Sequence, residues 1–256
     1  MSSNQIAVVT GGSRGLGFET AKALRALNFD LVLIGKDAVR LQTAQSELEK
    51  ISSPDSTLTS YICDLENSSD ISSLIEKTKN NHKTPDVLML AHGVMSAKMS
   101  KTLKTDLAEW RRVMSINLDS NFQLINSLAP AMVEARKGRV IIFSACLGRM
   151  SGPGNAGGLA PYRISKAGVN ALVRNLAHET GLGSRGFLID AICPNHSRTD
   201  MGGPDAPLSA EEGVRTAIWL ATRPFNSLGE TDQEKQYRDW ETGFIVTGKQ
   251  IGRAHV

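Results

Sequence analysis

The chain has 256 residues, of which 41% are apolar and 21% charged, so it can bury a sizeable core as a single large domain. Its formal net charge of +3 comes without a run of basic residues or interleaved aromatics, which disfavours nucleic-acid and membrane-surface binding. The three cysteines are widely spaced and form no C-x-x-C pair, so neither a disulfide framework nor a metal site is predicted. Without a signal-peptide pattern or an apolar run of about 20 residues, we expect a soluble, cytoplasmic protein.

Short apolar runs alternate with stretches of helical spacing along the chain. Strands are predicted at residues 5–10, 30–35, 58–63, 87–91, 139–145, 187–193 and 244–246. Helices are predicted at residues 18–27, 38–50, 68–80, 106–135 and 162–180, and a surface loop at 202–209, whereas the polar stretch 223–240 receives no assignment. Strands this apolar, separated by helices, indicate an α/β fold: a Rossmann-type, doubly wound parallel sheet with helices on both faces, in a single domain over residues 1–256.

The glycine-rich turn TGGSRGLG, residues 10–17, lies between the first predicted strand and the first predicted helix. Gly11, Gly15 and Gly17 allow a sharp turn and a close approach of the backbone to a pyrophosphate, whose charge is favoured by free N–H groups at a helix start. Such turns also serve tight packing. The position directly after the first strand favours a dinucleotide site.

The segment YRISK, residues 162–166, places Tyr162 and Lys166 at i and i+4, on one face of a helix. A free tyrosine ionises at a pH of about 10, and a fixed nearby cation favours the phenolate, so Tyr162 is a candidate general acid and base. The same spacing is common on ordinary solvated helices, so the motif gains its weight from the others.

Together these segments resemble the short-chain dehydrogenase/reductase family over nearly the whole chain, and its carbonyl reductases in particular. The resemblance also rests on CDL (63–65), SINL (115–118) and PNHSRTDMGG (194–203). It implies hydride transfer between a nicotinamide and a carbonyl or alcohol carbon, with Tyr162 exchanging the proton, Lys166 holding the nicotinamide ribose and Asn117 supporting a water that relays protons. The resemblance implies these cofactor-binding residues: Gly11, Ser13, Arg14, Gly15, Leu16, Gly17, Asp64, Leu65, Ala91, Gly93, Tyr162, Lys166, Pro194 and Thr199.

Two segments depart from the family pattern near the expected cofactor site. Residues 90–93 read LAHG where the family usually has N-N-A-G, so His92 either contacts the cofactor ribose or fills polar space near the sheet edge. Asn195 replaces the usual glycine after Pro194, and asparagine tolerates left-handed backbone angles better than most residues.

A third departure falls on the catalytic serine of the family. An ungapped match of GRVIIFSACLG, residues 138–148, puts that position at Ala145, with Ser144 one residue early. Successive strand side chains point to opposite faces, so Ser144 can replace the missing hydroxyl only if the chain bends there. Ser144 is therefore either a candidate catalytic hydroxyl or a strand-end residue that bonds backbone, and Cys146 and Ser151 are weaker candidates.

The end of the second strand favours NADP(H) over NAD(H). NAD-dependent relatives place an acid there for the adenosine ribose, whereas this chain has Gly35 followed by Lys36. Arg14 and Lys36 are expected to converge on a 2′-phosphate, which makes Lys36 a further cofactor-binding candidate. Asp37 has a structural use as the N-cap of the next helix.

The sequence thus predicts an NADP(H)-dependent oxidoreductase that reduces a ketone or aldehyde, working slowly because Ala145 leaves the carbonyl oxygen one donor short. A 3-oxoacyl group on an acyl carrier protein is a second candidate substrate, and an NADPH-binding sensor or scaffold with little catalysis is the alternative function. The short, Gly- and Pro-rich region 201–210 predicts an open pocket. The resemblance further implies a homodimer or homotetramer formed through the helices near 106–135 and 161–180.

Overall fold

The computed structural model of the protein describes residues 4–51, 55–97, 101–150, 157–225 and 244–246. They contain a seven-stranded sheet with the strand order β3-β2-β1-β4-β5-β6-β7. The strands are β1 (Ile6–Thr10), β2 (Asp30–Gly35), β3 (Leu58–Ile62), β4 (Val87–Leu90), β5 (Gly138–Phe143), β6 (Phe187–Cys193) and β7 (Phe244–Val246). The predicted parallel sheet is confirmed from β1 to β6, whereas β7 pairs antiparallel with β6. An antiparallel edge strand on an otherwise parallel sheet is a common arrangement.

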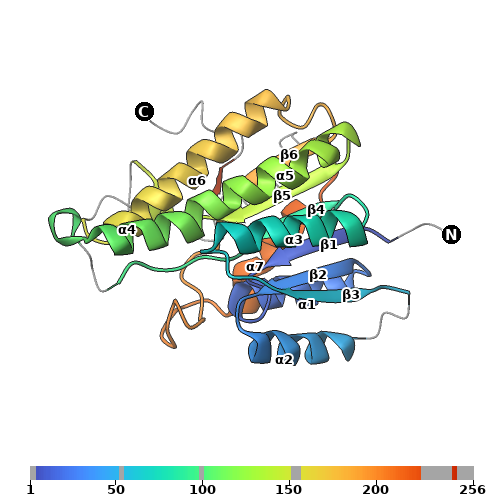
Figure 1. The fold of residues 1–256 in the computed structure, drawn as a ribbon, viewed down its shortest axis with the longest axis horizontal. Coiled ribbons are helices and arrows are strands. Elements are labelled where there is room, and N and C mark those ends of the chain that lie inside the picture. Colours follow the sequence, from blue (N-terminus) through green and yellow to red (C-terminus); the bar gives the residue numbers. More distant parts are fainter. Residues whose placement is uncertain (1–3, 52–54, 98–100, 151–156, 226–243, 247–256) are drawn as a thin grey trace.

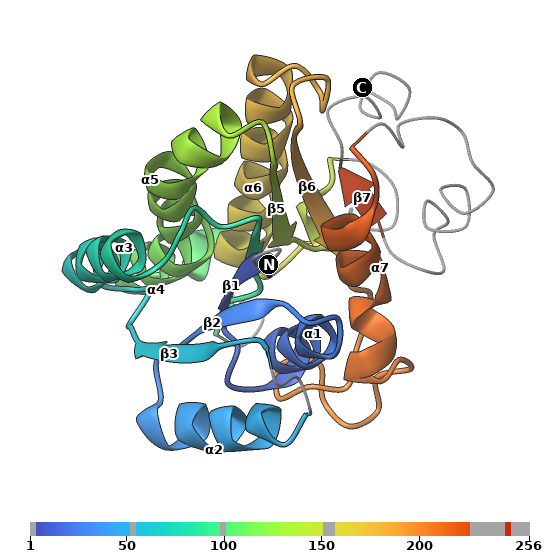
Figure 2. The same cartoon turned by 90° about the vertical axis from the view of Figure 1, so that its right-hand side faces the viewer.

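Helices cover both faces of this sheet, as Figures 1 and 2 show. Figure 2 places α1, α2 and α7 on one face and α3, α5 and α6 on the other. The helices are α1 (Gly15–Ala26), α2 (Ala38–Glu49), α3 (Ser68–Asn81), α4 (Leu107–Met114), α5 (Ser120–Glu134), α6 (Ala160–Glu179) and α7 (Ala210–Thr222). The doubly wound Rossmann-type fold is therefore confirmed.

The apolar strands fill two cores, one on each face. Within β1, Val8 packs into the layer of α3, α5 and α6, and its neighbour Val9 packs into the layer of α1, α2 and α7. Because both faces of the sheet are covered, successive residues of the central strands are mostly apolar, which explains why these strands read as nearly continuous apolar runs, whereas the edge strand β3 (LTSYI) contains Thr59 and Ser60 and is only partly buried. This arrangement leaves the carboxyl ends of the strands as the edge where polar side chains gather.

Two features of the helices were not predicted. Helix α7 begins at a capping box in which the Ser209 hydroxyl accepts from the Glu212 N–H, and the Glu212 carboxylate accepts from the Ser209 N–H. This S-x-x-E signal is visible in the sequence, but the preceding loop composition concealed it. The predicted helix at 106–135 is present as α4 and α5, joined by a π-helical turn at Ser115–Asp119.

Several predictions lie partly or wholly outside the described residues. Ser151 and most of the polar stretch 223–240 fall there, so the single domain over 1–256 stays a prediction. Within the described residues, every helix is too short or too polar to cross a bilayer. In the same part of the chain, no cluster of His, Cys, Asp and Glu side chains has the arrangement of a metal site.

Candidate active site

A cavity of about 810 Å³ opens at the carboxyl ends of the central strands, next to the point where the strand order reverses between β1 and β4. Every residue predicted to bind the cofactor lines this cavity, and so does Ser144. Asn117 lies outside the lining and is fully buried. The sequence motifs therefore converge in space. The sequence did not predict some further lining residues, which include Arg40, Glu66, Arg112, Ile116 and Asp200.

The glycine turn forms a cradle that side chains would fill. Gly11 has φ +65°, and a Cβ there would lie 3.0 Å from the Cα of His92. A Cβ on Gly17 would lie only 2.2 Å from the Gly11 carbonyl oxygen. Helix α1 begins at Gly15, its N-cap residue makes no side-chain capping bond, and the residues of its first turn, Gly15, Leu16 and Gly17, line the cavity. This geometry fits a pyrophosphate.

Tyr162 and Lys166 lie at the inner end of the cavity, 6% and 3% exposed. The Lys166 Nζ donates to the Phe143 carbonyl oxygen at 2.7 Å and lies 5.7 Å from the centre of the Tyr162 ring. Burial, with smaller contributions from Cys193 and Cys146, raises the pKa of Tyr162, and burial lowers the pKa of Lys166 to about 8. The predicted shift of Tyr162 toward phenolate is therefore wrong, because desolvation of the buried phenol is the largest influence on its pKa.

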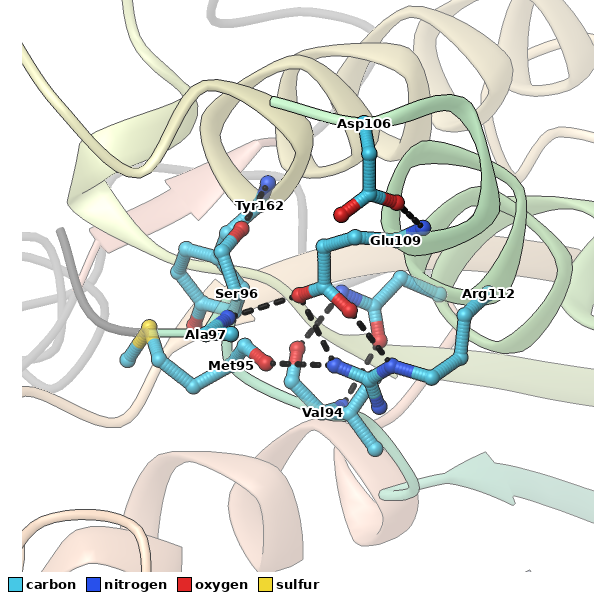
Figure 3. Close-up of polar contacts among 9 residues, drawn as sticks. Val94, Met95, Ser96, Ala97, Asp106, Glu109, Arg112 and Tyr162 are labelled. Atoms are coloured by element: carbon cyan, nitrogen blue, oxygen red, sulfur yellow. Dashed lines mark hydrogen bonds and ion pairs between the residues drawn. The ribbon is translucent and has the colours of Figure 1, made fainter. Parts of the chain in front are cut away.

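The loop after β4 is fastened directly to the helix that carries Tyr162. Figure 3 shows Ser96 beneath the first turn of α6, where its Oγ accepts from the Tyr162 backbone N–H at 2.9 Å. The side chain of Asn117 binds the same loop, since its Oδ1 accepts from the Val94 N–H at 2.8 Å and its Nδ2 donates to the Val94 carbonyl at 2.9 Å. These bonds fix the position of Tyr162 relative to the strand ends.

A charged pair on α4 holds the far end of this loop. The Glu109 carboxylate accepts from the Ala97 N–H at 2.6 Å, and the Arg112 guanidinium donates to the Met95 carbonyl at 3.1 Å (Figure 3). The two side chains are joined at 2.8 Å, and their hydrogen bond lowers the pKa of Glu109 and raises that of Arg112. Both groups therefore favour their ionised forms, and Arg112 also lines the cavity.

Asn117 sits in the π-helical turn between α4 and α5, and π turns of this kind are frequent at functional sites. Its Nδ2 donates to the Ser165 Oγ on α6 at 3.0 Å, and its carbonyl accepts from Asn121 at 2.7 Å. The residue connects α4, α6 and the loop after β4 from behind the cavity. Its position suits a positioning residue better than one that faces the substrate.

His92 is 7% exposed and is hydrogen-bonded on both sides of its ring. Its Nδ1 lies 2.6 Å from the Thr10 Oγ1, and its Nε2 lies 2.7 Å from the Ser120 Oγ. Because Ser120 donates its own proton to the Ile116 carbonyl at 2.6 Å, we infer that Nε2 carries the proton of the imidazole and that Thr10 donates to Nδ1. His92 thus fills polar space between β1, β4 and the π turn, and its side chain is committed to protein contacts.

Replacing His92 with leucine should lower the free energy of unfolding by about 2 to 3 kcal/mol, since two buried hydrogen bonds are lost. Burial lowers the pKa of His92 from 6.5 to about 3, so the folded protein binds its proton more weakly than the unfolded chain does. The contribution of His92 to the free energy of unfolding is therefore fully present above pH 6.5, and it declines as the pH falls toward about 3. Urea unfolding of the wild type and of His92→Leu at several pH values should show both effects. His178→Leu, at an exposed position, should leave the free energy of unfolding nearly unchanged. Equal losses of free energy of unfolding in the two variants would contradict the assignment of a structural role to His92.

The chain at the end of β5 stays extended through Ala145. The Ser144 N–H donates to the Ile192 carbonyl at 2.7 Å, Ala145 has φ −151° and ψ 149°, and a 3-10 turn begins only at Cys146. The bend that would let Ser144 take the place of a hydroxyl at position 145 is therefore not present. The Ser144 Oγ donates to the Asn170 Oδ1 at 2.7 Å, so its proton is committed to α6.

The adenosine end of the cavity, near β2 and β3, is rich in charge. The Lys36 Nζ lies 2.6 Å from the Asp64 Oδ2, and this contact raises the pKa of Lys36. Partial burial of Asp64 opposes its ionisation, but the hydrogen bond from Lys36 keeps the pKa of Asp64 below its usual value. Asp37 is confirmed as the N-cap of α2, since its Oδ1 accepts from the Arg40 N–H at 3.0 Å. Arg14 and Lys36 both line the cavity, and Arg40 adds a lining cation that was not predicted. Arg14 and Arg40 meet at Asp200, whereas Lys36 pairs with Asp64, so convergence of Arg14 and Lys36 on one phosphate stays a prediction.

Comparison with known proteins connects this geometry to a family. A family model described as short chain dehydrogenase matches residues 5–207. The chain belongs to the short-chain dehydrogenase family. The 3-oxoacyl-[acyl-carrier-protein] reductase of Rickettsia prowazekii is 29% identical, with 76% of this chain and 73% of the relative covered, and that of Pseudomonas aeruginosa is 28% identical, with 90% and 86% covered. A metagenomic short-chain oxidoreductase solved in complex with NADP is 28% identical, covers 88% of this chain and 94% of its own, and superposes with a TM-score of 0.73.

As a short-chain dehydrogenase, the protein is an NAD(P)-dependent oxidoreductase that acts on small molecules. The glycine cradle and the residues around it fit a dinucleotide, in which Gly11 and Gly17 would lie against the pyrophosphate and Lys166 would hold the nicotinamide ribose. The dehydrogenase retains a left-handed backbone at Asn195, with φ 56°, where the family has glycine. That departure therefore leaves the local backbone conformation intact.

Proposed function

We propose that this short-chain dehydrogenase is an NADP(H)-dependent carbonyl reductase that converts a ketone or aldehyde to an alcohol, or runs in reverse. The observation that carries the proposal is the proton-bearing phenol of Tyr162, buried beside Lys166 at the inner end of a dinucleotide-sized cavity. Burial keeps the phenol protonated, as a general acid for reduction must be. When bound, the nicotinamide supplies the hydride.

The chain's own residues then perform the proton transfer and the positioning. Tyr162 donates its phenolic proton to the carbonyl oxygen of the substrate, and the Lys166 ammonium stabilises the phenolate left behind. Lys166 donates to the Phe143 carbonyl, and it would also hold the nicotinamide ribose of the cofactor. Asn117 maintains the distance between Tyr162 and the loop after β4 through its bonds to Val94 and Ser165.

We propose further that the site lacks one donor to the carbonyl oxygen. Ala145 stands where relatives carry the catalytic serine, and the Ser144 hydroxyl donates to Asn170. Tyr162 is then the main donor to the oxygen, and the chemical step is slow compared with a site that has both groups.

Two substrate classes are consistent with this site. Simple ketones and aldehydes suit the open pocket that the short, Gly- and Pro-rich region 201–210 predicts, and Thr199, Asp200 and Met201 line the cavity. The 3-oxoacyl group on a carrier protein is favoured by the two bacterial relatives, which are both 3-oxoacyl-[acyl-carrier-protein] reductases. A panel of ketones, aldehydes and 3-oxoacyl thioesters with NADPH, followed by loss of cofactor absorbance, distinguishes them. Tight NADPH binding without turnover of any compound would instead favour the sensor or scaffold function.

NADPH should bind more tightly than NADH by about ten- to a hundredfold, since a charge-assisted hydrogen bond contributes about 1.5 to 3 kcal/mol. Arg14, Lys36 and Arg40 line the adenosine end of the cavity and are the expected partners of the 2′-phosphate. Fluorescence titration of both cofactors tests this, with Arg14→Ala as the variant that should reduce the difference. Tighter binding of NADH would refute the preference.

We expect a homodimer or homotetramer in solution. Large apolar side chains are exposed on the helices that the family resemblance assigns to the interface: Leu107 on α4 is 59% exposed, Phe122 on α5 52% and Ile164 on α6 43%. Burying them against a second copy would remove this apolar surface from water. Light scattering should report two or four chains per particle, and Phe122→Asp should shift the protein toward monomer. A wild-type monomer at all concentrations would contradict the expectation.

We propose that the protein is located in the cytoplasm. The thiols of Cys63, Cys146 and Cys193 are all free, which supports a reducing, cytoplasmic location.

A further inference from the structure

The cations at the adenosine end each face a carboxylate of the protein itself. Lys36 pairs with Asp64, and Arg40 pairs with Asp200 at 3.3 Å and with Asp37 at 3.8 Å. Arg14 pairs with Asp200 as well. A phosphate can reach these cations only by replacing or sharing their present partners.

The three carboxylates differ in how firmly they are held. Asp37 caps α2 through the Arg40 N–H, and Asp64 accepts from the Glu66 N–H at 3.1 Å, so both also serve the local backbone. Asp200 is 65% exposed at its side chain, and its contacts within the described residues are those to the two arginines. Asp200 is therefore the carboxylate that a ligand displaces with the least cost to the fold.

Asp200 also comes from a different part of the chain than its partners. Arg14 precedes α1 and Arg40 lies on α2, whereas Asp200 belongs to the loop between β6 and α7. Its neighbour Thr199 rests on the glycine turn, since a Cβ on Gly15 would lie 3.2 Å from the Thr199 methyl group. The two ion pairs thus connect the loop beside the expected nicotinamide to the walls of the adenosine end.

We propose that Asp200 is a specificity-determining residue, whose carboxylate holds Arg14 and Arg40 in the free enzyme and competes with the 2′-phosphate of NADP(H) for them. The inference rests on the proposed preference for NADP(H). A phosphate monoester carries a charge of about −1.5 to −2 and presents three oxygens, so it displaces a single carboxylate. The tethered carboxylate nevertheless lowers the net gain from the phosphate. NAD(H) brings no 2′-phosphate, so it leaves the Asp200 ion pairs in place.

Removal of this competitor should tighten binding only for ligands that carry the 2′-phosphate. The probes are 2′,5′-ADP, which carries the phosphate without the nicotinamide, and 5′-AMP, which lacks it. In Asp200→Asn, calorimetric titration should show 2′,5′-ADP binding roughly three- to tenfold more tightly than in the wild type, as expected for the loss of two exposed ion pairs. Binding of 5′-AMP should be unchanged, and melting temperatures should confirm that the variant folds.

Asp205→Asn is the matched control, because Asp205 is exposed on the same loop and does not line the cavity. This substitution changes the net charge of the protein by the same amount as Asp200→Asn. Equal tightening by Asp205→Asn, or equal tightening for both probes, would show a general charge effect and overturn the inference. Unchanged 2′,5′-ADP binding in Asp200→Asn, with weaker binding in Arg14→Ala, would also overturn it but leave the NADP(H) preference standing. If the wild type binds 2′,5′-ADP no more tightly than 5′-AMP, the preference itself fails.

Discussion

Ala145→Ser is expected to raise the rate of carbonyl reduction by about a hundred- to a thousandfold, because one well-placed donor to a developing oxyanion contributes about 3 to 4 kcal/mol. The backbone at Ala145 is extended and its side chain is 8% exposed, directly after Phe143 and Ser144, which line the cavity. A serine there supplies the hydroxyl that the ungapped family match finds missing. Cofactor affinity should stay within about threefold of the wild type, since the donor acts on the substrate oxygen.

Ser144→Ala is the matched comparison for this gain. The Ser144 Oγ bonds Asn170 on α6, so its loss should lower the free energy of unfolding by about 1 kcal/mol and reduce turnover less than tenfold. If Ser144→Ala abolishes turnover while NADPH binding persists, Ser144 is the catalytic hydroxyl and the register assigned to Ala145 is wrong. Steady-state rates and titrations of both variants decide between the two outcomes.

Tyr162→Phe should lower turnover by about a hundred- to ten-thousandfold, which is the range that general acid catalysis contributes. The ring is buried at the inner end of the cavity, and phenylalanine keeps its shape while removing the proton donor. NADPH binding should therefore persist. Turnover close to that of the wild type would show that another group donates the proton.

Tyr61→Phe provides the control for this substitution. Tyr61 lies on β3, outside the cavity, and its hydroxyl lies 3.0 Å from the His82 Nε2. Removal of this hydroxyl should therefore leave turnover unchanged. A comparable rate loss in both variants would indicate damage to the fold rather than to the proton donor.

The sequence was sufficient for the sheet and for most of the cavity lining. The strands of a sheet covered on both faces must be apolar, and the glycine turn must be free of side chains, so both leave local signals. The Tyr162–Lys166 spacing was equally local. These features depend on residues near one another in the chain.

Other features depend on packing between distant segments. Asp200 meets Arg40 across 160 residues, and although Asp200 lies in the segment 194–203, no pattern in the sequence connects it to Arg40. The direction of the Tyr162 pKa shift follows from its burial, which helical spacing does not reveal. The π turn at Asn117 follows from its bonds to Val94 and Ser165, which again come from other elements.

The most direct test of the proposed function is transfer of a labelled hydride. NADPH carrying deuterium at the transferred position of its nicotinamide is mixed with the enzyme and the best carbonyl of the panel, and the alcohol is analysed by mass spectrometry and NMR. The proposed reductase predicts one deuterium on the carbinol carbon of the product, formed far more slowly by Tyr162→Phe. Bound NADPH with no labelled alcohol from any carbonyl of the panel would contradict the reductase function and favour a sensor or scaffold.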